Sequence, residues 1–286
     1  MRVIPIEDLL GFVREGAPWG DVTSEAVVPD VACRAVVRAK GRGVVAGLLE
    51  ARTLFEHFGV TVRERSADGR AVVPGTVLLE LDGPARTILL VERTALNIIG
   101  RMSGIATRTR EAVEAVRAVS PDVRVAATRK TAPGLRMLDK KAVILGGGDP
   151  HRYSLSDMVL IKDNHLALVP LPEAIRRAKK ESLYRVVEVE VETVEDAITA
   201  AGAGADIILL DNMTPDAVRE TVRALAGRGL RDRLTLEVSG GIGDDDLAGY
   251  AAAGVDIISM GALTHTVRNF DVSLDILPGA GTVRVP

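Results

Sequence analysis

Basic residues gather in the segment from His151 to His165, which reads His-Arg-Tyr-Ser-Leu-Ser-Asp-Met-Val-Leu-Ile-Lys-Asp-Asn-His. The segment Thr128-Arg129-Lys130-Thr131 and a glycine triplet at 146–148 come shortly before it. The chain has 4 histidines, and two of them lie in this segment. Core packing does not require so many cations beside glycines. The pattern predicts a binding site for a small molecule that carries several negative charges.

Three glutamates alternate with valines further along the chain, at Glu188, Glu190 and Glu192. Residues two apart on a strand point to the same side, so the three carboxylates share one face. A strand buried on both faces of an α/β protein is usually apolar throughout. Because an unpaired buried carboxylate is costly, we expect cations from neighbouring strands, or a metal ion, to face this row. The alternative is an edge strand with one face in water.

The apolar run 207–210 ends in Asp211-Asn212, which places Asp211 near the same mouth as Glu190. Acidic groups there can hold ribose hydroxyls, or a Mg²⁺ ion that bridges phosphates. Two glycine-containing segments follow the last two predicted strands: 239–243, and 259–261 with Thr264 and His265. Glycines let backbone amides approach an anion, and a helix start after such a loop adds its dipole. The pair of loops predicts a phosphate site.

Strands and helices alternate from residue 123 onward, which predicts an α/β fold with a parallel sheet covered by helices. Polar residues collect where the strands end, the usual location of sites in such folds. The strand count falls short of a complete barrel. The predicted strands are 123–128, 157–161, 184–191, 206–211, 234–239 and 255–260, and the clearest helices are 193–203, 214–226 and 243–252.

The first hundred residues predict a small α+β sandwich, with short strands in 33–47 and a helix over 48–58. Strand signals continue over 60–90, separated by Asp68-Gly69, Pro74-Gly75 and Asp82-Gly83. A long helix follows, with apolar positions at helical spacing from 95 to 116. We place the domain boundary near residue 104. The polar residues that lie off the apolar face of this helix are Arg93, Asn97, Arg101 and Arg108.

The composition is that of a globular protein with a substantial core, because 47% of the 286 residues are hydrophobic. A net charge of −3 argues against a chain that binds nucleic acid through its overall charge. The single cysteine, Cys33, excludes an intramolecular disulfide and a cysteine metal cluster. The N-terminal residues lack signal-peptide features, and no apolar run approaches about 18 residues. We therefore expect a cytoplasmic location and no membrane contact.

Seven sequence blocks together resemble the carboxylating nicotinate-nucleotide pyrophosphorylases, also called quinolinate phosphoribosyltransferases. The blocks occur in the order and spacing of that family. Gly20 to Ser24 and Thr264-His265 extend the match over almost the whole chain. The blocks are 92–97 (Glu-Arg-Thr-Ala-Leu-Asn), 101–107, 127–136 (Ala-Thr-Arg-Lys-Thr-Ala-Pro-Gly-Leu-Arg), 146–152, 187–191, 210–212 and 239–242.

The resemblance implies an N-terminal α/β sandwich over 1–104, an incomplete, about six-stranded α/β barrel over 105–270 and a tail over 271–286 that returns to the first domain. It implies transfer of phosphoribose from phosphoribosyl pyrophosphate to quinolinate, with loss of pyrophosphate and carbon dioxide, giving nicotinate mononucleotide for NAD biosynthesis. It also implies Mg²⁺ and a homodimer or higher homo-oligomer with shared active sites.

The resemblance further assigns residues to each part of the reaction. Lys130, Glu190, Asp211 and Lys162 would be catalytic, and Lys130 or Lys162 would protonate the ring after decarboxylation. Quinolinate would be bound by Arg129, His151, Arg152, Lys162 and, from the partner subunit, Arg93. Mg²⁺ would be held by Glu190 and Asp211, directly or through water. Phosphoribosyl pyrophosphate would be bound by Lys130, Glu190, Asp211, Asn212, Ser239, Gly240, Gly241, Gly261 and His265.

Other functions remain open at this point. A molybdenum-transport-associated relative of the same family is one, although Pro133 to Arg136 and Lys162 to His165 are of the quinolinate type. A Schiff-base lyase or aldolase on an α/β barrel is another, with Lys130 or Lys162 as nucleophile. A non-enzymatic phosphate-ligand sensor would fit the glycine loops but would leave the glutamate row without a purpose.

Overall fold

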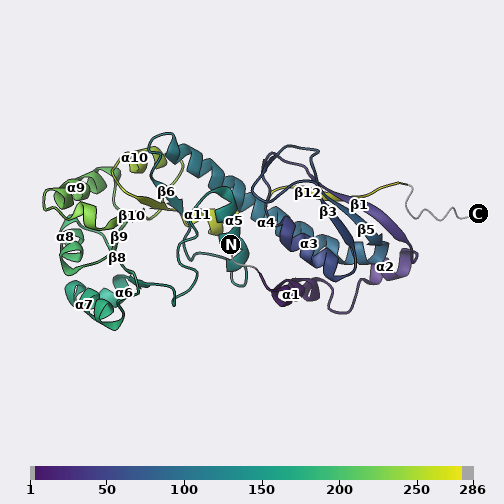
Figure 1. The fold of residues 1–286 in the computed structure, drawn as a ribbon, viewed down its shortest axis with the longest axis horizontal. Coiled ribbons are helices and arrows are strands. Elements are labelled where there is room, and N and C mark those ends of the chain that lie inside the picture. Colours follow the sequence, from purple (N-terminus) through teal and green to yellow (C-terminus); the bar gives the residue numbers. More distant parts are fainter. Residues whose placement is uncertain (1–3, 279–286) are drawn as a thin grey trace, which may run out of the picture. The chain divides into compact units, whose positions relative to one another are not determined.

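The computed structural model describes residues 4–278 (Figure 1). Backbone contacts divide the chain into two compact units. Unit 1 comprises the residues up to Arg108, Pro133–Gly147 and the residues from Thr266 onward, and unit 2 comprises Thr109–Ala132 and Gly148–His265. Segment 133–147 therefore groups with unit 1, although it lies inside the range 105–270 predicted for the barrel.

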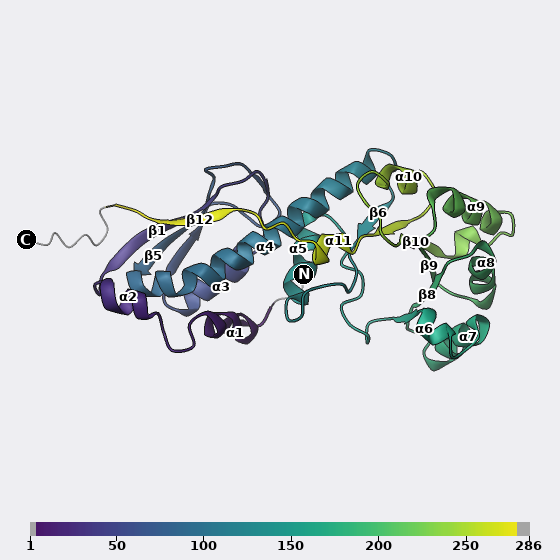
Figure 2. The same ribbon diagram turned by 180° about the vertical axis from the view of Figure 1, so that it is seen from behind.

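Unit 1 contains an antiparallel sheet in the order β12-β1-β5-β3, as the sandwich prediction requires. Helix α3 (Leu48–His57) packs against β3 and β5. Within the predicted tail, β12 pairs with β1, and residues 279–286 lie outside the described residues (Figure 2). The strands are β1 (Ala32–Ala39), β3 (Thr61–Glu64), β5 (Val77–Pro84) and β12 (Val272–Ile276), with a separate pair, β2 (Gly43–Val44) and β4 (Ala71–Val72); α1 (Ile6–Gly16) and α2 (Val22–Val27) precede them.

The prediction of strand signals up to residue 90, with a break at Asp82-Gly83, is wrong. Strand β5 runs through both residues, and α4 (Ala85–Arg117) begins directly after it. Gly83 serves close packing rather than a turn, because a Cβ atom there would lie 3.2 Å from the Cα of Val60.

The polar face predicted for α4 is present in unit 1, where Arg93 and Asn97 are exposed while Ala95 and Ile99 are buried. Arg101 forms a bidentate ion pair with the fully buried Asp139 of α5 (Arg136–Gly146), with Nε–Oδ1 at 2.7 Å and Nη2–Oδ2 at 2.9 Å. Gly104 of α4 allows close packing, since a Cβ atom there would lie 2.2 Å from the carbonyl oxygen of Arg268.

Unit 2 contains the six predicted strands in one parallel sheet, which confirms the partial barrel. The order is β6-β11-β10-β9-β8-β7, so β8 is an inner strand and the edge-strand alternative for the glutamate row is wrong. The strands are β6 (Arg124–Ala126), β7 (Val159–Ile161), β8 (Val187–Val191), β9 (Ile207–Asp211), β10 (Thr235–Ser239) and β11 (Ile257–Ser259).

Helices cover the outside of this sheet and have local start and stop signals. Thr193 caps α8 (Val194–Ala203) by accepting the Asp196 N–H, and Gly204 ends it with a φ of 94°. Thr214 caps α9 (Pro215–Ala226), with proline at its first turn. The others are α6 (Asp163–Leu166), α7 (Leu171–Glu181), the short 3₁₀ turn Arg231–Arg233, α10 (Leu247–Ala251) and α11 (Ala262–His265).

Helix α10 is shorter than the predicted 243–252, because residues 240–246 form a loop instead of a helix start. The glycine loop after β10 therefore does not open directly into a helix.

The core of unit 2 is apolar, with Val189, Ile208, Leu210 and Val238 fully buried. Among residues 4–278, no helix combines the length and apolar character needed to cross a bilayer.

Candidate active site

The predicted site residues of unit 2 follow the carboxyl ends of its strands, and parallel strands place these ends at one edge of the sheet. Lys162 follows β7, Glu190 lies near the end of β8, and Asp211 ends β9. Ser239 ends β10, and Gly261 comes shortly after β11. Arg93 is the exception among the predicted residues, because it lies on α4 in unit 1.

Two arginines from different loops, Arg129 and Arg152, form the cationic part of the site. Burial lowers the pKa of Arg152, and the positive charge of Arg129 lowers it further, against opposite effects of Glu188 and Asp157. The Nε atom of Arg129 is buried and has no hydrogen-bond partner within residues 4–278. Two neighbouring cations and a buried donor without an acceptor indicate a site for an anion.

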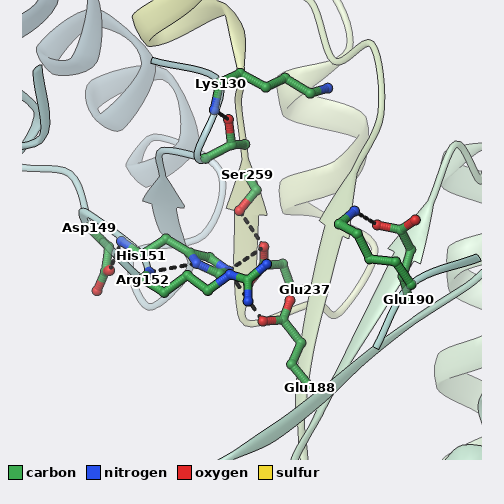
Figure 3. A network of polar contacts seen from close by, with 10 residues as sticks. Lys130, Asp149, His151, Arg152, Glu188, Glu190, Glu237 and Ser259 are labelled. Atoms are coloured by element: carbon green, nitrogen blue, oxygen red, sulfur yellow. Dashed lines mark hydrogen bonds and ion pairs between the residues drawn. The ribbon is translucent and has the colours of Figure 1, made fainter. Parts of the chain in front are cut away.

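The loop between α5 and β7 places His151 between Arg152 and the interior of the sheet. Asp149 Oδ1 accepts the His151 N–H at 2.9 Å, and the His151 backbone has a φ of 53°. The Arg152 N–H donates to His151 Nδ1 at 2.6 Å, while His151 Nε2 lies 3.3 Å from Glu188 Oε2. His151 thus lies beside Arg152, and both ring nitrogens face protein groups (Figure 3).

The glutamate row faces a basic side chain at two of its three positions. Glu188 is fully buried and faces His151, and Glu190 is paired with the Lys162 ammonium. Glu192 is exposed because β8 ends at Val191, before the row is complete. The row therefore divides into a buried, a half-buried and a solvent-exposed carboxylate.

Sequence reasoning missed Glu237 and Ser259, which lie on β10 and β11. Glu237 is 1% exposed; its Oε1 lies 3.5 Å from His151 Nε2 and accepts a hydrogen bond from Ser259 Oγ (Figure 3). Burial, and then the charge of Glu188, raises the pKa of Glu237 to about 7. The sequence pattern that could have identified Glu237 is the one seen in β8, a glutamate between apolar residues of an inner strand.

Glycines shape the part of the site predicted to hold a phosphate. Gly240 has a φ of 103°, and a Cβ atom there would lie 2.2 Å from Asn212 Oδ1. A Cβ atom on Gly261 would lie 3.0 Å from Lys130 Cδ and 3.1 Å from His265 Nε2. Thr264 Oγ1 donates to the Lys130 carbonyl oxygen at 2.9 Å. Gly261 therefore lets two basic side chains converge over one backbone position.

Glu190 and Asp211 come from neighbouring strands, β8 and β9. Asp211 accepts a hydrogen bond from Asn212 Nδ2 at 2.6 Å, and both carboxylates are half-buried. Oxygen ligands from one or two carboxylates, completed by phosphate oxygens and water, are the set that Mg²⁺ prefers. The donor chemistry of these two residues fits that ion.

Comparisons with known proteins agree over nearly the whole chain. Residues 21–103 match the sequence model of the quinolinate phosphoribosyl transferase N-terminal domain, and residues 105–275 match that of its C-terminal domain. A probable nicotinate-nucleotide pyrophosphorylase (carboxylating) of Archaeoglobus fulgidus is 47% identical over 260 residues, 91% of this chain and 99% of that protein. The human nicotinate-nucleotide pyrophosphorylase (carboxylating) is 38% identical over 85% of this chain and 82% of its own.

Solved structures show the same fold. The nicotinate-nucleotide pyrophosphorylase of Francisella tularensis superposes with a TM-score of 0.88 at 33% identity, covering 96% of this chain and 98% of that one. The corresponding protein of Ehrlichia chaffeensis gives a TM-score of 0.90 at 32% identity, covering 97% of this chain and 100% of that one.

Proposed function

The chain belongs to the quinolinate phosphoribosyltransferase family, and from this we infer how its residues carry out the reaction. The enzyme transfers phosphoribose from phosphoribosyl pyrophosphate to the ring nitrogen of quinolinate and decarboxylates the product to nicotinate mononucleotide, a step of NAD biosynthesis. The observation that carries our assignment of the site is the half-buried cation pair Arg129 and Arg152, next to carboxylates on the neighbouring strands.

Quinolinate carries two adjacent carboxylates, and the cationic part of the site supplies donors for both. Arg129 has a buried Nε that needs an acceptor, and burial and the charge of Arg129 lower the pKa of Arg152, an effect that a bound anion would oppose. Arginine forks bind carboxylates with two parallel hydrogen bonds. We propose that Arg129, Arg152 and Lys162 hold the two carboxylates, with His151 beside them, and so aim the ring nitrogen at the ribose. This is mainly a proximity effect.

Loss of pyrophosphate leaves positive charge on the ribosyl carbon. Glu190 and Asp211 lie at the ends of β8 and β9, where fixed negative charge would stabilise that centre. Lys162 is paired with Glu190, which joins the quinolinate side of the site to the ribosyl side. We propose that Lys130, Asn212, Ser239, Gly240, Gly241, Gly261 and His265 bind the phosphates.

We propose that Glu190 and Asp211 also hold Mg²⁺, directly or through water. The ion would supply positive charge to the pyrophosphate as it leaves. After ribosyl transfer the ring nitrogen is cationic and accepts the electron pair released when carbon dioxide departs. Lys130 and Lys162 are both proposed as donors of the proton that the ring carbon then takes up.

The proposal of a shared active site rests on a groove in unit 1. This groove has a volume of about 830 Å³, and Arg93, Asn97 and Arg101 contribute to its wall together with apolar residues of α1 and α4. An exposed cation on a monomer surface contributes little by itself. We propose that the groove receives the partner subunit of a homodimer or higher homo-oligomer, and that Arg93 completes the partner's quinolinate pocket.

We also propose a cytoplasmic location, which is consistent with the composition.

The test is direct. Purified protein is mixed with quinolinate, phosphoribosyl pyrophosphate and Mg²⁺, and formation of nicotinate mononucleotide and carbon dioxide is followed. Product should form only when all three are present. If carbon dioxide is released without phosphoribosyl pyrophosphate, or if no nucleotide forms, the proposal fails.

A further inference from the structure

We propose that Glu237 takes up a proton when the quinolinate dianion binds beside His151, so that the site gains on substrate binding one proton, the number that the later decarboxylation consumes when Lys130 or Lys162 delivers it to the ring carbon. This inference rests on the proposed function. It assigns a task to a residue that lies behind the binding pocket, and it is carried by the arrangement of His151, Glu188 and Glu237.

The three groups form a closed cluster, and their ligand atoms all lie within 4.8 Å of one another. The side chain of His151 is 11% exposed, whereas Glu188 and Glu237 are 0% and 1% exposed. His151 therefore separates the two carboxylates from the open part of the site. Ser259 Oγ fixes Glu237 from the far side, and the Arg152 N–H fixes the ring at Nδ1.

Two carboxylates, Glu188 and Asp149, oppose a negative charge on Glu237, whereas His151 and Ser259 favour it. Glu237 is faced by Glu188 from β8, by His151 and Asp149 from the loop between α5 and β7, and by Ser259 from β11. Both oxygens of Glu188 lack a hydrogen-bond partner within the described residues, although Glu188 interacts electrostatically with Arg152. Burial and the charge of Glu188 raise the pKa of Glu237 to about 7, so that near neutral pH the group is close to half-protonated.

Quinolinate changes this balance in one direction. Before it binds, the positive charges of Arg129 and Arg152 lie near the cluster, and Glu188 interacts with Arg152. Two substrate carboxylates neutralise those cations and cover the exposed edge of His151. Both changes disfavour a negative charge on Glu237, and its pKa rises further.

A bound divalent cation would be another way to neutralise the cluster. The neighbouring arginines oppose it, because a cation held by Glu188 and Glu237 would be repelled by Arg129 and Arg152. A proton neutralises the carboxylate without adding a charge. It is also what the reaction consumes, because the carbon–carbon bond breaks, its electron pair stays on the ring carbon, and that carbon must bind one proton.

The sign of the pH dependence follows from linkage. When a ligand raises the pKa of a group, the protonated group binds the ligand more tightly. This gain in affinity is complete at pH values below the ligand-free pKa, and it is lost as the pH rises towards the ligand-bound pKa. With a ligand-free pKa of about 7, little proton uptake is expected at pH 5.5, and most of one proton per site, about 0.5–1, at pH 8. Quinolinate affinity should fall by up to about tenfold per pH unit above neutrality.

The experiment is calorimetric titration of the whole protein with quinolinate, without phosphoribosyl pyrophosphate, in buffers of different ionisation enthalpy at pH 5.5 and pH 8. Proton uptake is the slope of the observed heat against that enthalpy. Benzene-1,2-dicarboxylate, which has both carboxylates but no ring nitrogen, shows whether the proton goes to the ligand. At pH 8, where both ligands are dianions, it should give the same uptake as quinolinate.

Glu237→Gln should bind quinolinate without proton uptake at pH 8 and with an affinity that changes little with pH. Asp206→Asn is the matched control, because Asp206 precedes β9 at the opposite end of the strand and accepts the Val187 N–H. It should keep the wild-type uptake. Ser259→Ala, which removes a hydrogen bond that lowers the pKa of Glu237, should move the uptake window to higher pH, and it replaces Glu237→Gln if that variant does not fold.

The outcomes separate this inference from the proposed function. Absence of quinolinate binding in the wild type would overturn the proposed function. Binding without proton uptake at pH 8, or equal uptake by wild type and Glu237→Gln, would overturn the inference alone. Stoichiometric metal in purified wild-type protein that is missing from Glu237→Gln would also overturn it, because a metal would then occupy the place of the proton.

Discussion

The Lys162 ammonium is paired with the Glu190 carboxylate across the neighbouring strands β7 and β8. One of these residues belongs to the proposed quinolinate pocket and the other to the proposed ribosyl site. The pair therefore connects the group that orients the nucleophile with the group that stabilises the developing cation. Because the two charges neutralise each other, neither the ammonium nor the carboxylate needs another charged protein group at the mouth of the sheet.

Removing the charge of Glu190 or Asp211 should slow the chemical step. Glu190→Gln and Asp211→Asn keep the shape but remove negative charge where the ribosyl cation forms, so kcat should fall by about 10²-fold or more. Steady-state kinetics measure this, with circular dichroism as the control for folding. Near-normal kcat in both variants would show that these carboxylates are structural.

Arg129→Ala should weaken quinolinate binding selectively. The variant removes the buried Nε donor and leaves Arg152 without its neighbouring cation. KM for quinolinate should rise by about 100-fold, in line with losing one partner of a buried charge pair, while KM for phosphoribosyl pyrophosphate should change little. Equal increases in the two KM values would contradict the proposed position of Arg129.

Gly240→Ala should impair the phosphate loop. The φ of 103° is unfavourable for alanine, and the new Cβ atom would lie 2.2 Å from Asn212 Oδ1. Strain of this kind costs about 1–3 kcal/mol. KM for phosphoribosyl pyrophosphate should increase about tenfold or more, since 1.4 kcal/mol corresponds to a factor of ten. Gly202→Ala is the control, because a Cβ atom at Gly202 meets nothing within 4 Å. Equal kinetics of both variants would argue against a binding function of this loop.

The shared site predicts complementation between inactive subunits. Arg93→Ala and Lys130→Ala should each be nearly inactive, but a heterodimer contains one site with both residues intact. With random mixing about half the dimers are mixed, so activity should return to about a quarter of the wild-type level per site. The two variants are unfolded together, refolded and assayed. If heterodimers form, as shown by differently tagged subunits, and no activity returns, Arg93 acts within its own chain.

Much of the fold could be predicted because the relevant signals are local. Apolar runs that end in Lys162 and Asp211 marked inner strands, and threonine and glycine residues marked the ends of α8. What could not be predicted depends on contacts between segments distant in sequence. Gly83 suggested a turn until its contact with Val60 was known, and segment 133–147 belongs to unit 1 through contacts such as Asp139 with Arg101.

The candidate site could likewise be predicted only in part. Cations and glycine loops at strand ends are visible in the sequence, and the structure places those of unit 2 at one edge of the sheet. Glu237 was missed because its importance comes from His151 and Ser259, which lie on a loop and a strand that are distant from it in sequence.

The central claim, that a cation pair recognises both substrate carboxylates, is tested most directly by substrate discrimination. The measurement is kcat/KM for quinolinate and for nicotinate, which lacks one carboxylate, under identical conditions with phosphoribosyl pyrophosphate and Mg²⁺. A buried charge left without its partner costs about 3–5 kcal/mol, so quinolinate should be preferred by more than about a hundredfold. Equal values for the two substrates would contradict the account.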